Sequence, residues 1–325
     1  MRIERGELQE LHAQPDSVLT LGSFDGLHLA HQALIRRVVE RAAASGLEAG
    51  LLTFEPHPRD VLGDSHLPVS RLMSPVEKLR MLEELGLERV ILLRFTPELA
   101  TWDAGRFLRE GLLGHVGLRH LVVGHNHGFG RDRGGNRLTL SSASRELGFG
   151  LEVLAPVLVD GEPVSSTRVR RALLDGRVEE ANALLGRPFR ITGPVVAGEG
   201  RGRSLGVPTA NLQLESGLLQ PADGVYAVRA TLEDGRRFPG MMNLGARPTF
   251  GETERRPEIH LFNLAEDLYG QSLRVDLLAF VRHTMRFNSG EQLATQLQED
   301  RKRIQERLER DASPAGLDDK ESSHG

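Results

Sequence analysis

The sequence has no cysteine, only three lysines and no long apolar run. The absence of cysteine excludes a disulfide framework, a thiolate metal site, an iron–sulfur cluster and a cysteine nucleophile. None of the lysines, at positions 78, 302 and 320, follows a glycine loop, which excludes a Walker-type phosphate loop. Any phosphate chemistry is therefore expected to use histidine, arginine, backbone amides and metal.

The chain also lacks an excess of charge of one sign. It carries 41 Lys and Arg against 45 Asp and Glu, so no nucleic-acid partner is expected, because phosphate-binding surfaces carry excess basic charge. The first residues do not have the composition of a signal peptide, and no stretch approaches the roughly 20 apolar residues of a membrane-spanning helix. We expect a cytoplasmic protein without a membrane partner.

A length of 325 residues favours two domains. In the first half, short apolar runs alternate with helical patterns, which is typical of a parallel α/β sheet. The predicted strands are Val18–Leu21, Ala49–Phe54, Val90–Phe95, Leu121–Gly124 and Leu151–Leu154, and the predicted helices are Ala33–Ala44, Pro75–Leu85, Asp103–Leu113, Ser166–Leu174 and Val178–Leu185.

Beyond Gly186-Arg187-Pro188 the pattern becomes that of antiparallel strands, with a hairpin signal at Glu233-Asp234-Gly235. It predicts a small β-barrel or sandwich closed by a long helix, Gly290–Arg310. The predicted strands are Gly224–Leu232, Arg237–Asn243, Glu258–Phe262 and Leu273–Phe280. The predicted domains are residues 1–186 and 187–312, followed by a polar, disordered tail, 313–325.

The segment Leu19–Gln32, LTLGSFDGLHLAHQ, runs from a buried strand through a turn into a helix. Gly22 and Gly26 allow the backbone to approach a ligand, and the helix N-terminus favours phosphate. His28 and His31 would lie there as paired donors that stabilise charge on a phosphate under attack. The alternatives are a metal site, a helix cap or a core histidine.

Three further polar clusters fall near strand ends or a helix start, where an α/β site is built: Phe54–Pro58, Val123–Gly135 and Ser165–Arg171. A Ser-Ser-Thr sequence at a helix start, followed by Arg168, predicts a triphosphate clamp. A capped surface helix is the alternative for that segment.

The second half offers a glycine- and arginine-rich stretch, Gly198–Leu212, and a candidate base. Thr209 and Asn211 are neutral oxygen ligands that suit Mg²⁺ together with phosphate oxygens, although a plain Pro-Thr turn is the alternative. Glu258 lies on the same strand face as His260 and could take a proton from an attacking hydroxyl. A salt bridge on a half-exposed strand is the alternative for Glu258.

Taken together, these motifs resemble a known family. The first half is similar to nucleotidyltransferases with a His-x-Gly-His turn, and the whole chain resembles the bacterial bifunctional riboflavin kinase/FAD synthetase family. Nine motifs of that family occur here in order: Gly22–His31, Thr53–Pro58, Gly124–Gly130, Ser165–Arg170, Leu205–Asn211, Gly224–Val228, Asn243–Thr249, Glu258–His260 and Asp267–Gly270.

The resemblance implies an α/β nucleotidyltransferase domain followed by an antiparallel riboflavin kinase barrel with a closing helix. The implied catalytic residues are His28 and His31 on the ATP phosphates and Glu258 as the base for the ribityl 5′-hydroxyl, with Thr209 and Asn211 on Mg-ATP. The implied ATP and phosphate contacts are Gly22, Phe24, Asp25, Gly26, Ser166, Thr167, Arg168, Gly206 and Pro208. The implied flavin contacts are Phe54, Pro56, His57, Pro58, Asn126 and Asn243.

The chain departs from the family pattern at Ala30, where glycine is usual, and at His127, where an aromatic residue is usual. The implied activity converts riboflavin to FMN and FMN to FAD, with ATP in both reactions, in a monomer or weak homo-oligomer. Two alternatives are an enzyme in which only the riboflavin kinase half is active and a non-catalytic flavin-binding protein.

Overall fold

A computed structural model describes residues 1–11, 15–63, 70–131, 134–198, 208–245, 255–264 and 266–312. The chain forms two compact units. The first takes Met1–Arg171, Ala183–Arg187 and Ser216–Leu219, and the second takes Ala172–Asn182, Pro188–Glu215 and the described residues from Gln220 on. The boundaries predicted for the domains stay a prediction, and the predicted tail, 313–325, lies outside the described residues.

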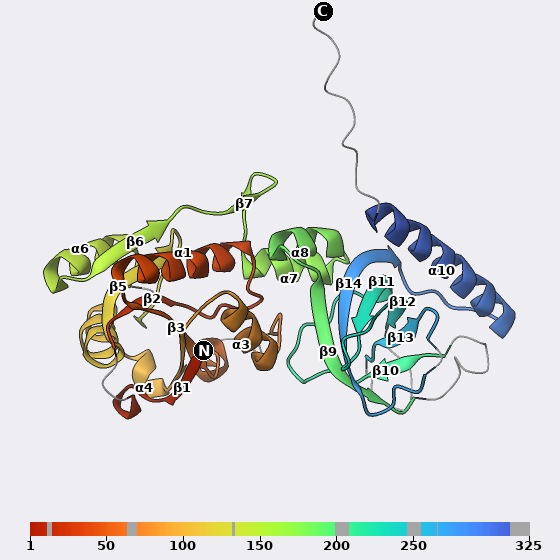
Figure 1. Cartoon of the computed structure of the whole chain (residues 1–325), viewed down its shortest axis with the longest axis horizontal. Helices are drawn as coiled ribbons and strands as arrows, with labels where there is room; N and C mark the ends of the chain where they lie inside the picture. The colour runs from red at the N-terminus through yellow and green to blue at the C-terminus, as the bar shows by residue number, and fades with distance from the viewer. Residues whose placement is uncertain are drawn as a thin grey trace, which may run out of the picture. The chain divides into compact units, whose positions relative to one another are not determined.

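The first unit is built on a six-stranded sheet in the order β1-β4-β3-β2-β5-β6, and every pairing in it is parallel (Figure 1). The strands are β1 (Arg2–Gly6), β2 (Ser17–Leu21), β3 (Glu48–Glu55), β4 (Arg89–Arg94), β5 (Leu118–Gly124) and β6 (Gly150–Leu154). This confirms the predicted parallel α/β fold. The strand order reverses at β2, which has β3 on one side and β5 on the other, and ligands bind parallel sheets at such a point.

Helices connect these strands. They are α1 (Leu29–Ser45), α2 (Pro58–Leu62), α3 (Pro75–Glu84), α4 (Pro97–Ala100), α5 (Ala104–Arg106), the π-helix η2 (Phe107–Val116), α6 (Arg137–Leu147) and α7 (Ser166–Leu174), with a short η1 (Leu8–Glu10) and a hairpin of β7 (Leu158–Val159) and β8 (Glu162–Pro163). The single helix predicted over Asp103–Leu113 is therefore divided between α5 and η2. Ser74 caps α3 as expected, because its side chain accepts a hydrogen bond from the Glu77 amide at 3.2 Å.

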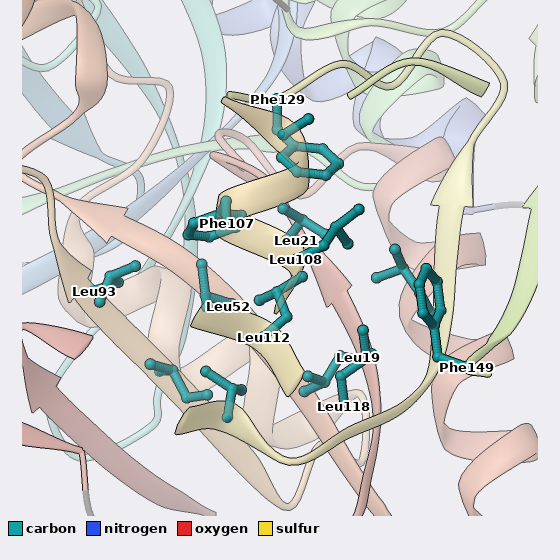
Figure 2. Close-up of a cluster of buried hydrophobic side chains, with 14 of the residues drawn as sticks. Leu19, Leu21, Leu52, Leu93, Phe107, Leu108, Leu112, Leu118, Phe129 and Phe149 are labelled. Atoms are coloured by element: carbon teal, nitrogen blue, oxygen red, sulfur yellow. The ribbon is translucent and has the colours of Figure 1, made fainter. Parts of the chain in front are cut away.

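Two hydrophobic clusters, which draw on alternate residues of the strands, form the core of this unit. Figure 2 shows Leu108 and Leu112 of η2 lying toward Leu19 of β2. Trp102 packs against the same cluster, and the Arg106 guanidinium lies 4.0 Å from the centre of its ring. Full burial of such side chains contributes about 1.5–3 kcal/mol each to folding, so this core holds the strand ends in place.

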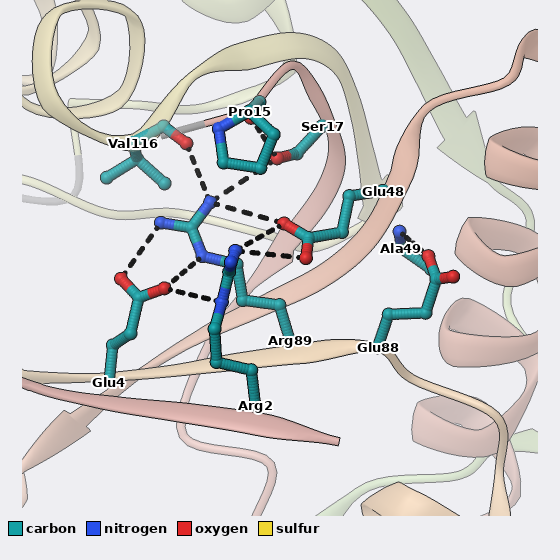
Figure 3. A network of polar contacts seen from close by, with 9 residues as sticks. All are labelled: Arg2, Glu4, Pro15, Ser17, Glu48, Ala49, Glu88, Arg89 and Val116. Atoms are coloured by element: carbon teal, nitrogen blue, oxygen red, sulfur yellow. Dashed lines mark hydrogen bonds and ion pairs between the residues drawn. The ribbon is translucent and has the colours of Figure 1, made fainter. Parts of the chain in front are cut away.

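The edge strand β1 was not predicted, because its sequence, RIERG, is mostly polar. It is attached through Arg89, whose side chain is fully buried (Figure 3). The Arg89 guanidinium donates to both carboxylate oxygens of Glu4, at 3.1 and 3.2 Å, and to the Val116 carbonyl at 3.0 Å. Glu48 lies 3.8 Å away as a second anionic partner. An ion network between distant residues therefore supports β1, and the local sequence pattern does not reveal it.

The second unit is a closed antiparallel barrel in the order β10-β13-β12-β11-β14-β9, which confirms the predicted barrel (Figure 1). Its strands are β9 (Phe189–Val196), β10 (Ala210–Leu212), β11 (Gly224–Thr231), β12 (Arg237–Leu244), β13 (Glu258–Leu261) and β14 (Ser272–Arg282), and α8 (Val178–Leu185) precedes them. Strands β9 and β10 were not predicted, because the first contains Gly-Pro and the second has only three residues.

The closing helix α10 (Gly290–Ala312) lies on the outer face of the barrel. Ile304 packs there with Val225, Met241 and Phe262. A fully buried Asp300 pairs with Arg282 of β14 at 2.7 Å and fixes the helix to that strand. No helix in the described part of the chain is long and apolar enough to cross a membrane.

Candidate active sites

The loop that joins β2 to α1 has an unusual backbone. Phe24, Gly26 and Leu27 have φ values of 48°, 81° and 42°, and non-glycine residues rarely adopt this left-handed region. A Cβ atom on Gly26 would lie 2.7 Å from Cδ1 of Leu72, so only glycine fits there. Phe24 and Leu27 are 2% and 0% exposed. Their burial anchors the strained loop, as is common at ligand-binding sites.

The two predicted histidines lie together at the start of α1. His28 is the N-cap residue, and its Nδ1 accepts a hydrogen bond from the His31 amide at 3.4 Å. The two rings stack with their centres 3.6 Å apart. His28 thus does cap the helix, which was one alternative for it. Because Nδ1 accepts, a neutral His28 carries its proton on Nε2, which leaves that group as a donor.

Both rings are held in the neutral form. Burial, with a smaller contribution from the charge of Arg170, lowers the pKa of His28 to about 4, although a backbone hydrogen bond opposes these effects. Burial lowers the pKa of His31 well below its ordinary value, and the charges of His28 and Lys78 act in the same direction. At neutral pH the pair can therefore donate N–H hydrogen bonds to a phosphate without being cationic.

Asp25 connects this loop to two other segments. Its carboxylate accepts the Leu72 amide, at 2.9 and 3.2 Å, and pairs with Arg170. Its carbonyl accepts the Ser166 hydroxyl at 3.0 Å. Burial raises the pKa of Asp25, and the charge of Arg170 opposes this shift. The carboxylate is bonded to protein groups, so its contribution to a phosphate site is to orient the loop.

The start of α7 is only partly arranged as the clamp prediction requires. Ser165 caps the helix by accepting the Arg168 amide at 3.2 Å, and Thr167 is exposed. The Arg168 guanidinium donates to the carbonyls of Val159 and Glu162, in or next to the β7–β8 hairpin, at 2.9 and 3.1 Å. Ser166, by contrast, reaches the β2–α1 loop.

Arg170 also reaches that loop, and no role was predicted for it from the sequence. A signal was available, because Arg170 lies four residues after Ser166 and such residues share a helix face. Arg168 lies only two residues after Ser166 and projects in another direction.

Aromatic residues gather where β3 and β5 end. The Phe54 ring lies 6.5 Å from Phe107, Phe107 lies 5.7 Å from Phe129, and Phe129 lies 5.6 Å from His127. The imidazole at position 127 thus packs in an aromatic row. Asn126, exposed beside it, is the second residue after β5. Phe107 and Phe129 belong to the buried core, and the half-buried Phe54 and His127 extend this row toward the surface beside the exposed amide of Asn126.

The predicted residues Pro56 and His57 form the turn between β3 and α2, and the predicted Pro58 is the first residue of α2. They therefore follow the carboxyl end of a strand that neighbours β2. His57 is close enough to Asp25 for its charge to lower the pKa of that carboxyl. The structure thus brings this turn to the same edge of the sheet as the β2–α1 loop.

A further charged group was missed. Lys78 of α3 donates from Nζ to the Ser23 carbonyl at 2.6 Å and to the Thr53 hydroxyl at 2.9 Å. Burial lowers the pKa of Lys78 to about 8, and the charges of Asp25 and Glu55 oppose this shift. The scarcity of lysine suggested that phosphate chemistry here does without it. No local spacing links position 78 to the loop at 22–26.

In the barrel, three predicted residues form one row across adjacent strands. Asn211 of β10 is opposite Glu258 of β13, and Glu258 is opposite Asn243 of β12. Directly opposed residues project from the same face of a sheet. Val225 continues the row beyond Asn243 and packs against α10. The row therefore lies on the face that α10 partly covers.

The segment that enters β10 is fixed by His260, which is 7% exposed. Its Nδ1 lies 2.8 Å from the Pro208 carbonyl, and a carbonyl only accepts, so Nδ1 carries a proton. Burial lowers the pKa of His260, although this hydrogen bond opposes the effect. A Cβ atom at Gly198 would clash with the amide of Asn211. The side chain of Asn211 is therefore closely confined.

The donor set at this position is compatible with a hard divalent cation. Thr209 lies immediately before β10 and Asn211 lies within it, and Mg²⁺ commonly takes few protein ligands and completes its shell with water and phosphate oxygens. Among the described residues no group of three or more His, Asp or Glu could hold a metal by itself. Gly206, predicted to contact ATP, lies outside the described residues.

Comparisons with known proteins match both units. A family model described as FAD synthetase matches residues 10–168, and one described as riboflavin kinase matches residues 185–308. Proteins named bifunctional riboflavin kinase/FMN adenylyltransferase are similar over most of their length. The one from Escherichia coli is 37% identical, covering 92% of this chain and 96% of its own, and the one from Pseudomonas fluorescens is 39% identical, covering 87% and 90%.

A solved structure also matches nearly the whole chain. It is named a macrolide-efflux protein from Streptococcus pneumoniae, is 32% identical, and has a TM-score of 0.87 over 94% of this chain and 99% of its own. This similarity supports the fold. The efflux activity in the name belongs to that protein and is not assigned to this chain.

Proposed function

Because the chain belongs to the family of bifunctional riboflavin kinases/FMN adenylyltransferases and thus makes FMN from riboflavin and FAD from FMN, we propose which of its residues carry each reaction. The parallel-sheet unit is the adenylyltransferase and the barrel unit is the kinase. Both reactions consume ATP, and ATP-using domains of these kinds work with a divalent metal. The finer assignments below are our proposal.

In FAD synthesis, an FMN phosphate oxygen attacks the α-phosphorus of ATP, and the bond to the pyrophosphate oxygen breaks. The attacking group is already an anion, so the protein supplies position and charge stabilisation and no nucleophile. His28 and His31 donate N–H bonds to the phosphate oxygens at the positive end of α1. The stacked, neutral histidine pair at this N-terminus is the observation that best supports the proposal.

The remaining adenylyltransferase contacts are proposed from the same arrangement. The backbone of Gly22, Phe24 and Gly26 faces the nucleotide, while Asp25 orients the loop. Ser166, Thr167 and Arg168 approach the triphosphate from α7. The flavin lies against Phe54, Pro56, His57, Pro58 and Asn126.

In FMN synthesis, the ribityl 5′-oxygen attacks the γ-phosphorus of ATP and ADP leaves. Such a hydroxyl is weakly acidic, so Glu258 takes its proton as the new bond forms. Asn243 holds the flavin from the next strand, while Pro208 and Gly206 contact ATP. Thr209 and Asn211 hold Mg²⁺, which when bound neutralises phosphate charge.

The setting of the enzyme is part of the proposal. We expect it to work in the cytoplasm, where ATP is available, as a monomer or weak homo-oligomer. The balanced charge supports the absence of a nucleic-acid partner. No membrane partner is proposed.

A time course with riboflavin, ATP and Mg²⁺, followed by chromatography of the flavins, tests the assignment. The wild-type chain should make FMN first and FAD afterwards. The double variant His28→Ala/His31→Ala should lose FAD synthesis and keep FMN synthesis. Continued FAD synthesis by that variant would contradict the histidine assignment. If the wild type makes FMN but converts no added FMN, only the kinase unit is active, and if it turns over neither flavin, the chain is a flavin-binding protein.

A further inference from the structure

Lys78 connects two strand ends beneath the β2–α1 loop. Its Nζ lies 2.6 Å from the carbonyl of Ser23, which follows β2, and 2.9 Å from the hydroxyl of Thr53, near the end of β3. Thr53 itself donates to the same carbonyl at 3.3 Å. Ser23 immediately precedes Phe24, the first left-handed residue of the loop. The ammonium group thus holds the carbonyl from which the strained turn begins.

Among the described residues, no anionic group contacts this ammonium group directly. Both oxygens bonded to it are neutral, and the nearby Asp25 carboxylate already bonds to Arg170 and to the Leu72 amide. An ammonium has three donors, and two are used in the contacts between described residues. A partly desolvated cation is costly unless an anion approaches it. This arrangement therefore favours an anionic ligand.

Two observations indicate where that anion binds. The charge of Lys78 contributes, less than burial and His28 do, to lowering the pKa of His31, which places the ammonium group near that ring. Lys78 is half-buried and not enclosed in the core, so a ligand at the mouth of the loop can approach it. The nearest ligand charge in the proposed reaction is a phosphate of ATP.

We propose that Lys78 is a positioning residue of the adenylyltransferase site, which fixes the turn at Ser23 and directs a positive charge toward the ATP phosphates bound by His31. This inference rests on the proposed function of the unit. The titratable groups that face Lys78 are the carboxyls of Asp25 in the loop and Glu55 on β3 and the neutral ring of His31 on α1. Since Lys78 carries its charge only when protonated, binding of a phosphate anion stabilises that form.

The direct test is a titration of the lysine ammonium groups by NMR, using protein labelled with ¹⁵N-lysine. Only three lysines contribute signals, and the variant Lys78→Met identifies one of them. The Lys78 ammonium should lose its proton near pH 8. Inorganic pyrophosphate or a non-hydrolysable ATP analogue should move that midpoint upward by about one unit, which corresponds to tenfold tighter binding to the protonated form. An unchanged midpoint would overturn the proposal.

The kinetic test uses Lys78→Met, which removes the charge and leaves an unbranched side chain that is one atom shorter. The KM for ATP in FMN adenylylation should rise by about tenfold or more, since the turn at Ser23 loses its support and the phosphates lose a nearby positive charge. The wild-type kcat/KM should also fall above pH 8, and the variant should not show this decrease. A lysine with only a structural role would not make kcat/KM depend on pH in this range. Riboflavin phosphorylation should not change.

The matched control is Lys302→Met on α10, where Nζ lies 4.0 Å from Glu306 and the side chain is 80% exposed. It should leave both activities as they are. If Lys78→Met keeps its KM for ATP and its pH profile within twofold of wild type, the proposal is wrong. If the wild type makes no FAD at all, the proposed function fails instead, and the NMR titration still decides whether phosphate binds near Lys78.

Discussion

In the parallel-sheet unit, the candidate residues lie on loops that follow strands and at the starts of helices. In the barrel unit, three of them lie within strands and are held in register: Asn211, Glu258 and Asn243. The loops of the first unit need additional polar contacts, such as those of Asp25 with Leu72 and Arg170, to fix their shape. The strands of the barrel are fixed by the hydrogen-bond ladder itself. A parallel sheet thus buries charge to build its site, and the barrel does not need to.

The largest expected effect concerns the row in the barrel. Glu258→Gln should lower kcat for riboflavin phosphorylation by about 10²- to 10⁴-fold, since an amide cannot accept the hydroxyl proton. Adenylylation of added FMN should be unaffected, and chromatography of the flavins measures both reactions. Glu299→Gln, on an exposed turn of α10, is the control and should change neither. Riboflavin phosphorylation at the wild-type rate by the Glu258→Gln variant would contradict the assignment of Glu258 as the base.

The next effect concerns the cost of buried charge in the parallel-sheet unit. Arg89→Leu leaves Glu4 and Glu48 without their buried partner, and breaking such a network costs about 3–5 kcal/mol of folding free energy. The urea concentration that halves FAD synthesis should fall sharply, whereas that for riboflavin phosphorylation should hold. Arg2→Leu is the control, because Arg2 binds the same Glu48 at 2.9 Å but its side chain is 48% exposed. Its expected cost is at most about 1 kcal/mol, and equal losses in both variants would contradict this interpretation.

A smaller effect concerns acid. Above pH 6.5, His28 is neutral in both the folded and the unfolded chain, so it adds no pH dependence. Below pH 6.5 the His28 ring is protonated in the unfolded chain, whereas in the folded chain it is protonated only near pH 4 and below. The free energy of unfolding of the parallel-sheet unit should therefore fall by up to about 1.4 kcal/mol per pH unit over that range.

The variant His28→Asn isolates this term, because asparagine can cap α1 but does not titrate. Urea unfolding of the variant and of the wild type, at a series of pH values across this window, gives the two slopes. The variant should show the shallower one. The same slope in both proteins would mean that His28 titrates normally in the folded chain.

The sequence predicted those parts of both units that depend on local pattern. The central strands follow from continuous apolar runs, and the shared face of Glu258 and His260 follows from alternation along one strand. The row of Asn211, Glu258 and Asn243 requires the register between strands, and β10 is too short to be recognised. The register comes from long-range pairing.

The missed residues of the first unit have a common physical origin. Arg89, Arg170 and Lys78 each act on residues at least 25 positions away in the chain. Such contacts form only once the tertiary fold brings distant segments together, so they cannot be predicted from periodicity or from the spacing of residues in the sequence. The motif residues 22–31 could be recognised, but the groups that hold the loop in shape could not.

The placement of Trp102 has a spectroscopic consequence. It is the only tryptophan of the chain, and it lies in the parallel-sheet unit, whereas both tyrosines, Tyr226 and Tyr269, lie in the barrel unit. Light that excites indole but not phenol therefore produces emission from one half of the molecule. Unfolding of the adenylyltransferase half can be followed by fluorescence without substrate, in an unlabelled and unmodified protein.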